Sequence, residues 1–100
     1  MVKVFISQPM KDKTDEQILA ERQRAKEEII KKLNDDEVEI IDSFFQGAPH
    51  DAKPLWFLGK SIQLLSTADV AYFIGNWRDY RGCRAENYIC KQYSITTIEE

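Results

Sequence analysis

Hydrophobic and polar positions change period along the chain, and the short-period segments predict four strands. Residues 2–6 are mostly β-branched or aromatic and stop shortly before a proline, as a strand does. Residues 37–41 alternate acidic and apolar positions, which is the pattern of an outer strand with one exposed face. Residues 70–74 are apolar throughout, as in a central parallel strand covered on both faces. Residues 95–98 form a last short strand.

A segment of helical spacing follows the first strand. Thr14 and Gln17 stand three positions apart in a capping box, so a helix begins there. We expect Arg22, on the core-facing stripe of this helix, to bury its aliphatic stem and keep its head in water. The helix ends at the Asn-Asp-Asp sequence of residues 34–36. Its stripe consists of Ile18, Arg22, Ala25, Ile29 and Leu33.

Two further helices follow the second and third strands. Pro54 suits the first turn of a helix, and apolar residues keep helical spacing from there to Leu65. The last helix spans residues 81–93. Between the second strand and Pro54 lies a connection of residues 42–53, which is long for a compact domain, and long loops are often functional.

Strands and helices alternate from end to end, which predicts an α/β fold with a four-stranded parallel sheet and helices on both faces. Right-handed crossovers and one reversal of direction give the strand order 2-1-3-4, a flavodoxin-like or Rossmann-like three-layer sandwich. Ligands bind such sheets beyond the carboxyl ends of the strands, where the order reverses. We therefore expect residues 7–14, 42–53 and 75–81 to meet around a pocket.

Length and composition restrict the class of protein. The 100 residues fit a single domain over 1–100, and 43% hydrophobic with 31% charged residues excludes a disordered tail. No apolar run approaches the ~18 residues of a membrane span, and the N-terminal residues lack a signal-peptide pattern, so we expect a cytoplasmic protein without a membrane partner. The 14 basic and 17 acidic residues argue against a nucleic acid duplex as partner.

The two cysteines predict free thiols. Cys83 and Cys90 are seven positions apart on the last predicted helix, so their Cα atoms lie ~10 Å apart, beyond the reach of a disulfide. Free thiols fit a reducing compartment. The chain has one histidine and no metal-ligand spacing, so we expect neither a metal site nor a cofactor.

One acidic residue lies on the predicted sheet-facing side of the last helix, where apolar residues are expected. Glu86 lies on the stripe that should pack against the sheet, little more than one turn from the helix start. Burial raises the pKa of such a carboxyl, whereas the helix N-terminus favours the anion. Two readings stay open: a structural acid bonded to a loop amide or to an arginine such as Arg78, or a functional acid. Gly82, one turn earlier, leaves room for a ligand to approach. The stripe consists of Gly82, Glu86, Ile89, Cys90 and Tyr93.

Three motifs together resemble the nucleoside 2-deoxyribosyltransferase superfamily, most closely a small branch found in phages and Gram-positive bacteria. The resemblance covers essentially the whole chain, and its most specific part is the Gly-x-x-x-Glu of Gly82 and Glu86, where the superfamily carries its nucleophilic glutamate. The motifs are Ser7-Gln8-Pro9-Met10 after the first strand, Ala68-Asp69-Val70 before the third, and Arg81-Gly82-Cys83-Arg84-Ala85-Glu86 at the start of the last helix.

The resemblance implies N-glycosyl chemistry on a nucleoside or nucleotide. In the family the glutamate attacks C1′ of the sugar, the base leaves, and the covalent sugar passes to another base or to water, which parallels retaining glycosidases. It implies Glu86 as the nucleophile of a deoxyribosyltransferase or an N-glycoside hydrolase. It also implies a homo-oligomer, because a neighbouring subunit often completes such sites in this superfamily.

Three helper positions depart from the family's pattern. A tyrosine that commonly orients the glutamate is matched by Phe5, and an aspartate that binds the sugar hydroxyls is matched by Ser61. The aspartate six positions before the glutamate is matched by Tyr80, with Asp79 one position away. These departures motivate a second hypothesis, a non-catalytic protein of the same fold that binds or sequesters a nucleotide. A third hypothesis is an interaction protein whose aromatic loops mediate oligomerisation.

Several other residues admit a functional and a structural interpretation. Asp42 follows the second strand, where it can reach the pocket or cap its own turn. Asp69 starts the third strand at the opposite end of the sheet, so we interpret it as structural. Trp77 and Tyr80 can stack on a base or pack against a partner subunit.

Charged and aromatic residues near the expected pocket remain open in the same way. Arg81 and Arg84 near the helix start can hold one small anion or remain solvated surface charges. Trp56, Phe44 and Phe45 are more typical of hydrophobic cover for the second helix than of ligand contacts. The residues predicted to bind substrate are Ser7, Gln8, Pro9, Met10, Asp42, Ser61, Asn76, Trp77, Asp79, Arg81 and Gly82.

Overall fold

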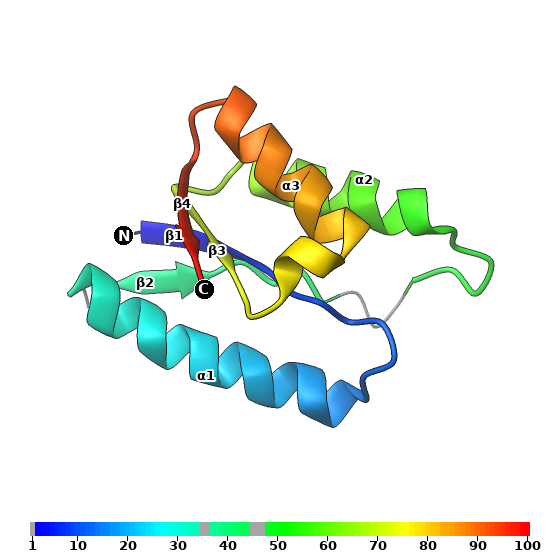
Figure 1. The fold of residues 1–100 in the computed structure, drawn as a ribbon, viewed down its shortest axis with the longest axis horizontal. Coiled ribbons are helices and arrows are strands. Elements are labelled where there is room, and N and C mark those ends of the chain that lie inside the picture. Colours follow the sequence, from blue (N-terminus) through cyan, green and yellow to red (C-terminus); the bar gives the residue numbers. More distant parts are fainter. Residues whose placement is uncertain (1, 35–36, 45–47) are drawn as a thin grey trace.

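The computed structural model describes residues 2–34, 37–44 and 48–100, and it confirms the predicted α/β fold (Figure 1). Strands and helices alternate, and a short 3-10 turn precedes the last helix. In chain order the elements are β1 (Val2–Ser7), α1 (Asp15–Leu33), β2 (Val38–Ile40), α2 (Pro54–Leu65), β3 (Val70–Phe73), η1 (Trp77–Asp79), α3 (Arg81–Gln92) and β4 (Thr96–Glu99).

The four strands form one parallel sheet in the order β2-β1-β3-β4, as predicted. Val4 of β1 is in register with Ile40 on one side and with Val70 on the other. Val70 is in register with Thr96 of β4. The order reverses between β1 and β3, which are the two central strands and the most buried ones.

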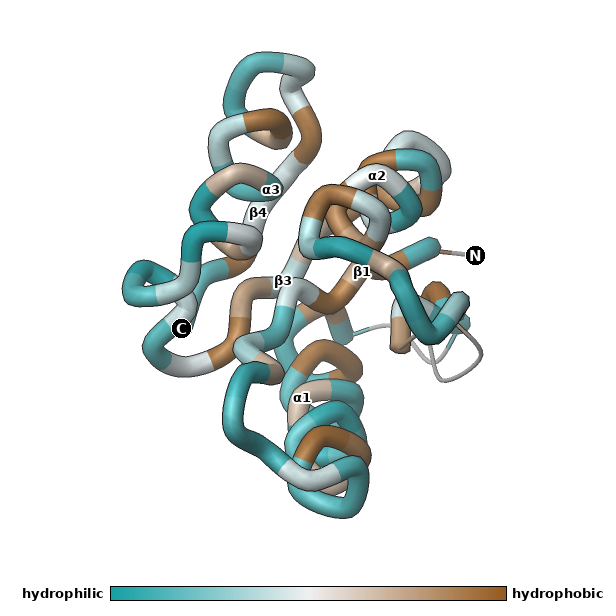
Figure 2. Tube along the Cα trace, turned by 90° about the vertical axis from the view of Figure 1, so that its right-hand side faces the viewer, coloured by the Kyte–Doolittle hydropathy of each residue, from teal (hydrophilic) through white to brown (hydrophobic). Residues whose placement is uncertain are grey.

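The sheet separates two hydrophobic clusters. Helix α1 covers one face, and α2 with α3 covers the other, so that the three layers are seen in both ribbon and tube views (Figures 1 and 2). Side chains alternate along β1, because successive residues of a strand point to opposite faces. Val4 and Ile6 pack with Ala25 and Ile29 of α1, whereas Phe5 packs in the cluster formed with α2 and α3.

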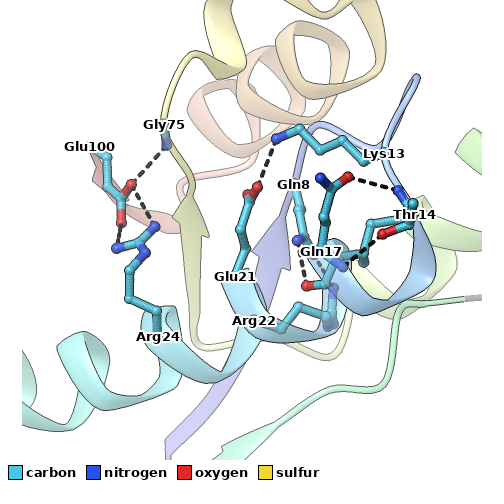
Figure 3. A network of polar contacts seen from close by, with 10 residues as sticks. Gln8, Lys13, Thr14, Gln17, Glu21, Arg22, Arg24, Gly75 and Glu100 are labelled. Carbon is cyan, nitrogen blue, oxygen red and sulfur yellow. Dashed lines mark hydrogen bonds and ion pairs between the residues drawn. The ribbon is translucent and has the colours of Figure 1, made fainter.

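The capping box predicted for the first helix is present. The backbone N–H of Gln17 donates to the Thr14 hydroxyl at 3.1 Å, and the Gln17 side-chain oxygen accepts from the backbone N–H of Thr14 at 2.9 Å (Figure 3). These two bonds satisfy donors that a helix start leaves without partners. The sharp start of α1 fixes where the loop after β1 ends.

Several boundaries differ from the prediction, because pairing and helix ends are set by neighbouring backbone. Strand β2 covers Val38–Ile40 instead of 37–41. Helix α3 ends at Gln92, so Tyr93 leaves the predicted sheet-facing stripe and its side chain is 77% exposed. The expected end of the first helix at residues 35–36, and Phe45 and Gln46 in the long loop, lie outside the described residues.

Asp69 has the structural position that the sequence indicates. One oxygen of its carboxylate accepts from the backbone N–H of Lys3 at 2.9 Å, and its own backbone N–H donates to the Lys3 carbonyl. Both contacts lie at the amino ends of β1 and β3, at the end of the sheet opposite the carboxyl ends of the strands. Among the described residues, no helix has the length and apolar composition of a membrane span.

Candidate functional site

A broad cleft lies at the carboxyl ends of the central strands, where the strand order reverses. Its volume is about 1670 Å³. All three predicted loop regions contribute to its walls, and the first turns of α2 and α3 complete them. The position agrees with the rule that parallel sheets bind ligands at such a switch point. Apolar wall residues include Phe5, Pro9, Met10, Phe44, Leu55, Phe57, Leu58 and Tyr80.

Glu86 faces this cleft from the second turn of α3, although only 7% of the residue is exposed. The Ser7 hydroxyl, at the end of β1, donates to Glu86 Oε1 at 2.7 Å. Ser61 of α2 lies near the carboxylate and lowers its pKa. Elements β1 and α2 therefore both act on this one buried acid of α3, and the Ser7 hydrogen bond occupies only Oε1.

Burial raises the pKa of Glu86 above its usual value, and this effect outweighs the influence of the Ser7 and Ser61 hydroxyls, which lower it. None of the ion pairs between described residues includes Glu86. Arg78, the structural partner considered from the sequence, pairs instead with Glu99 at 3.2 Å. The acid is therefore stabilised by neutral donors and borders open space, as a reactive carboxylate requires.

Cys83 lies one turn before Glu86 and belongs to the same group of side chains. It is buried and lines the cleft. Burial raises the pKa of its thiol to about 11, and the charge of Glu86 adds to this effect. The thiolate is scarce at neutral pH, so Cys83 is a poor nucleophile beside Glu86. Cys83 and Cys90 are both free and buried.

Most of the residues predicted to bind substrate lie around the cleft. Ser7 lies behind its surface in contact with Glu86, whereas Asp42 and Trp77 are not among the lining residues. The predicted residues that line the cleft are Gln8, Pro9, Met10, Ser61, Asn76, Asp79, Arg81, Gly82 and Glu86.

Asp42 caps its own turn. Its Oδ1 accepts from the backbone N–H of Phe44 at 3.3 Å, and the residue is exposed. Such an Asx contact is the usual role of an aspartate that follows a strand. The structure therefore does not place this carboxylate beside Glu86.

Trp77 packs in the core instead of the cleft. The η1 turn directs its ring inward, 5.0 Å from the ring of Phe73, and leaves it 5% exposed. The guanidinium carbon of Arg78 lies 4.4 Å from the centroid of the Trp77 ring. The Trp77 indole nitrogen has no hydrogen-bond partner among the described residues. Tyr80, at the end of the same loop, does line the cleft.

The start of α3 forms an open, partly basic rim. A Cβ atom built on Gly82 meets no atom within 4 Å, so the space beside this glycine belongs to the cleft. Arg81 and Arg84 also line the cleft and are exposed. Arg84 donates to the Arg78 carbonyl at 2.8 Å, which holds its head along the loop before α3.

Two polar residues of the site were not recognised from the sequence. Arg22 does not simply leave its head in water: its guanidinium hydrogen-bonds to Gln8 (Figure 3) and to Ser43, and both of these residues line the cleft. The available signal was its place on the apolar stripe of α1, which we interpreted as burial of the stem alone. Nothing in the sequence indicated Ser43, since its partner comes from another element.

No group of three or more metal-ligating side chains is brought together in the part of the chain that the structure describes. No known protein family, curated protein or solved structure matches the chain.

Proposed function

We propose that the protein carries out N-glycosyl chemistry on a nucleoside or nucleotide, with Glu86 as the nucleophile. One observation carries the proposal: a buried carboxylate, hydrogen-bonded to the Ser7 hydroxyl and paired with no cation of the described residues, faces a cleft at the switch point of a parallel sheet. The resemblance to the nucleoside 2-deoxyribosyltransferase superfamily, whose nucleophilic glutamate matches Glu86, supports the same chemistry.

In this proposal a carboxylate oxygen of Glu86 forms a bond to C1′ of the sugar while the C1′–N bond breaks. The base leaves with the electron pair of that bond and takes a proton from the water of the cleft. Water or a second base then attacks C1′, breaks the ester to Glu86 and loses a proton, which restores the carboxylate. Ser7 holds the carboxylate in place through both steps.

The helper positions suit this chemistry in part. Phe5 is buried and offers no hydroxyl to Glu86, but Ser7, two positions later on the same face of β1, supplies one. The aromatic rings of Phe57 and Tyr80 line the cleft and can stack on a base. The protein thus has an acid, a hydroxyl partner and a stacking surface within one cleft.

A second candidate function is nucleotide binding without turnover. Retaining enzymes keep their two carboxyl groups only about 5 Å apart. The acids that line the cleft besides Glu86 are Asp12 and Asp79, and both are exposed. No hydrogen bond links either of them to Glu86 among the described residues. This lack of a second buried acid favours a protein that holds its ligand intact.

Base release separates the two functions. The protein is incubated with deoxynucleosides and deoxynucleotides, and free base is measured by chromatography. We expect release by the wild type, no release by Glu86→Gln, and unchanged release by the control Glu27→Gln on the exposed side of α1. Release that persists in Glu86→Gln would exclude Glu86 as nucleophile. Ligand-dependent melting shifts without free base would support the binding protein. If no compound of the panel gives free base or a melting shift, the interaction protein is supported.

Compartment and assembly belong to the same proposal. Two buried free thiols fit the reducing cytosol. Leu55, at the rim of the cleft, is 77% exposed, and Phe57 beside it is 38% exposed. A second copy of the chain that covers this rim would complete the cleft, and sedimentation of Leu55→Asp against the wild type tests it. Equal masses at the monomer value would exclude the homo-oligomer.

A further inference from the structure

Arg22 reaches the cleft walls from the far side of the sheet. It lies on α1, which covers the face opposite α2 and α3 (Figure 1). Its Nη1 donates to Gln8 Oε1 at 3.2 Å. Its Nη2 donates to the Ser43 hydroxyl at 2.9 Å and to the Ile41 carbonyl at 3.4 Å. The planar guanidinium therefore binds acceptors from two separate loops at once.

Both loops form part of the cleft. Gln8 follows β1 and Ser43 follows β2, and each is buried and lines the cleft. The Gln8 amide nitrogen also donates to the Ile18 carbonyl at 2.8 Å, so both ends of this amide are tied to α1. The Ser43 hydroxyl is additionally within 3.4 Å of the Ile6 carbonyl. Arg22 is the residue that contacts both Gln8 and Ser43.

Stability alone does not account for this arrangement. Burial lowers the pKa of Arg22, and the charge of Asp42 opposes this only in part. All of its hydrogen-bond acceptors are neutral, and no ion pair of the described residues includes it. Even a half-buried charge whose acceptors are all neutral costs desolvation that an apolar side chain of the same size would avoid. A role in the geometry of the site gives such a residue a reason to be there.

We propose that Arg22 is a positioning residue that fixes two walls of the cleft, the loops after β1 and β2, in their ligand-binding geometry. The inference rests on the proposed function, since the ligand concerned is the nucleoside or nucleotide. Arg22 has no bond to Glu86 or Ser7, so it acts on binding and not on the nucleophile.

Steady-state kinetics of base release test this role. Arg22→Met keeps an unbranched aliphatic side chain and removes the guanidinium group. We expect its KM to rise about tenfold, as for a loss of ~1.4 kcal/mol of binding, with kcat within about twofold of the wild type. Ser43→Ala, which removes one acceptor, should show a smaller rise in KM. Lys26→Met, an exposed change on the same helix, is the control and should leave both constants unchanged. An unchanged KM, or an equal fall in kcat, in Arg22→Met overturns the proposal.

Arg22→Lys separates geometry from charge. Lysine keeps the positive charge but lacks the planar guanidinium whose two terminal nitrogens contact both loops. Positioning requires that this variant show most of the rise in KM seen for Arg22→Met. Wild-type kinetics in Arg22→Lys would mean that only the charge matters, which overturns the proposal. This variant and Ser43→Ala also serve if Arg22→Met does not fold.

Hydrogen exchange decides the matter independently of turnover. In the free protein, the amides of residues 41–44, Gln8 and Met10 should exchange faster in Arg22→Met than in Lys26→Met, while those of α3 stay unchanged. Equal exchange in the two variants overturns the positioning role. If the wild type neither binds nor cleaves any nucleotide, the proposed function fails, and the exchange result still supports or overturns the fixing of the two loops.

Discussion

Glu86 and Arg22 are both charged residues on an apolar helix stripe, and the structure buries Glu86 and half-buries Arg22. The stripe pattern correctly predicts that each side chain points towards the sheet. It does not predict the hydroxyl of Ser7 or of Ser43, because these partners come from elements far away in the chain. Residue-scale reasoning therefore finds the unusual charge but not the atoms that surround it.

The raised pKa of Glu86 predicts how its replacement affects stability. Between the ordinary glutamate value, about 4.3, and the raised one, the folded state binds more protons than the unfolded state. The stability of the wild type therefore falls as pH rises through this window. Glu86→Gln keeps an acceptor for Ser7 and lacks this penalty. We expect its melting temperature to equal that of the wild type below about pH 4 and to exceed it at pH 7. The shift should be ~4–8 °C for each kcal/mol by which the free energy of unfolding increases.

Circular dichroism melts between pH 3.5 and 8 measure this difference. The control Glu27→Gln, at an exposed position, should show no such dependence on pH. A difference in melting temperature that stays constant or shrinks with rising pH would contradict the burial of an ionised Glu86.

Ser7→Ala should move the acid limb of the activity. The Ser7 hydrogen bond lowers the pKa of Glu86, so its loss raises this pKa further and keeps more of the carboxyl protonated. We expect the rise of kcat/KM with pH to occur at higher pH than in the wild type, together with a stability loss of ~1 kcal/mol. A pH–rate profile checks this. Ser66→Ala, an exposed hydroxyl change at the end of α2, should leave the profile in place.

At the scale of elements, period and capping predict which segments are helices and strands, but not their last residues. The capping box fixes the start of α1 within the sequence itself. The end of α3 depends on the turn that leads into β4, where Ser94 has a φ of 58°. The η1 turn is too short to produce a period, and it is this turn that directs Trp77 into the core.

Two helical glycines provide a matched pair of variants. An added Cβ meets no atom within 4 Å at Gly59 of α2 or at Gly82 of α3, so alanine fits at both positions. Gly59→Ala should stabilise the protein by about 0.5–1 kcal/mol, because the unfolded chain loses freedom that the helix does not use. Urea denaturation measures this gain.

The same methyl group should act differently at Gly82, because this residue lines the cleft. We expect Gly82→Ala to remain folded and to weaken nucleotide binding severalfold, whereas Gly59→Ala binds like the wild type. Calorimetric titration compares the two. Equal affinities would show that the ligand does not approach Gly82.

At the scale of the whole molecule, the handedness of crossovers predicts the sheet order and hence the edge at which the cleft opens. What it cannot predict is how the last strand is tied to the rest. The Glu100 carboxylate accepts from the Tyr72 hydroxyl at 2.6 Å. It also accepts from the backbone N–H of Gly75 at 2.8 Å and from Nη1 and Nη2 of Arg24 (Figure 3). These partners come from α1, β3 and the loop after β3. Burial and this contact raise the pKa of Tyr72 to about 12.

Replacement of Glu100 should have the opposite pH dependence to that of Glu86. Burial acts to raise the pKa of Glu100, but the bonds from Arg24, Tyr72 and Gly75 together lower it. Its contribution to stability is therefore present above the ordinary glutamate pKa and is lost as pH falls through the lowered one. Glu100→Gln should be less stable by ~1–2 kcal/mol at pH 7 and equal to the wild type in strong acid. Chemical denaturation at several pH values tests this, and a loss that persists in acid would contradict it.

The inward turn of Trp77 has a practical consequence for spectroscopy. Its indole is enclosed between Phe73 and the Arg78 guanidinium, whereas Trp56 lies on α2 beside Phe57. Trp56→Phe leaves Trp77 as the single tryptophan, whose emission maximum shifts to the red only when the packed interior opens to water. Trp77→Phe leaves a single reporter on the helix that borders the mouth of the cleft. The fluorescence of the two single-tryptophan proteins can thus distinguish unfolding of the molecule from the binding of a ligand.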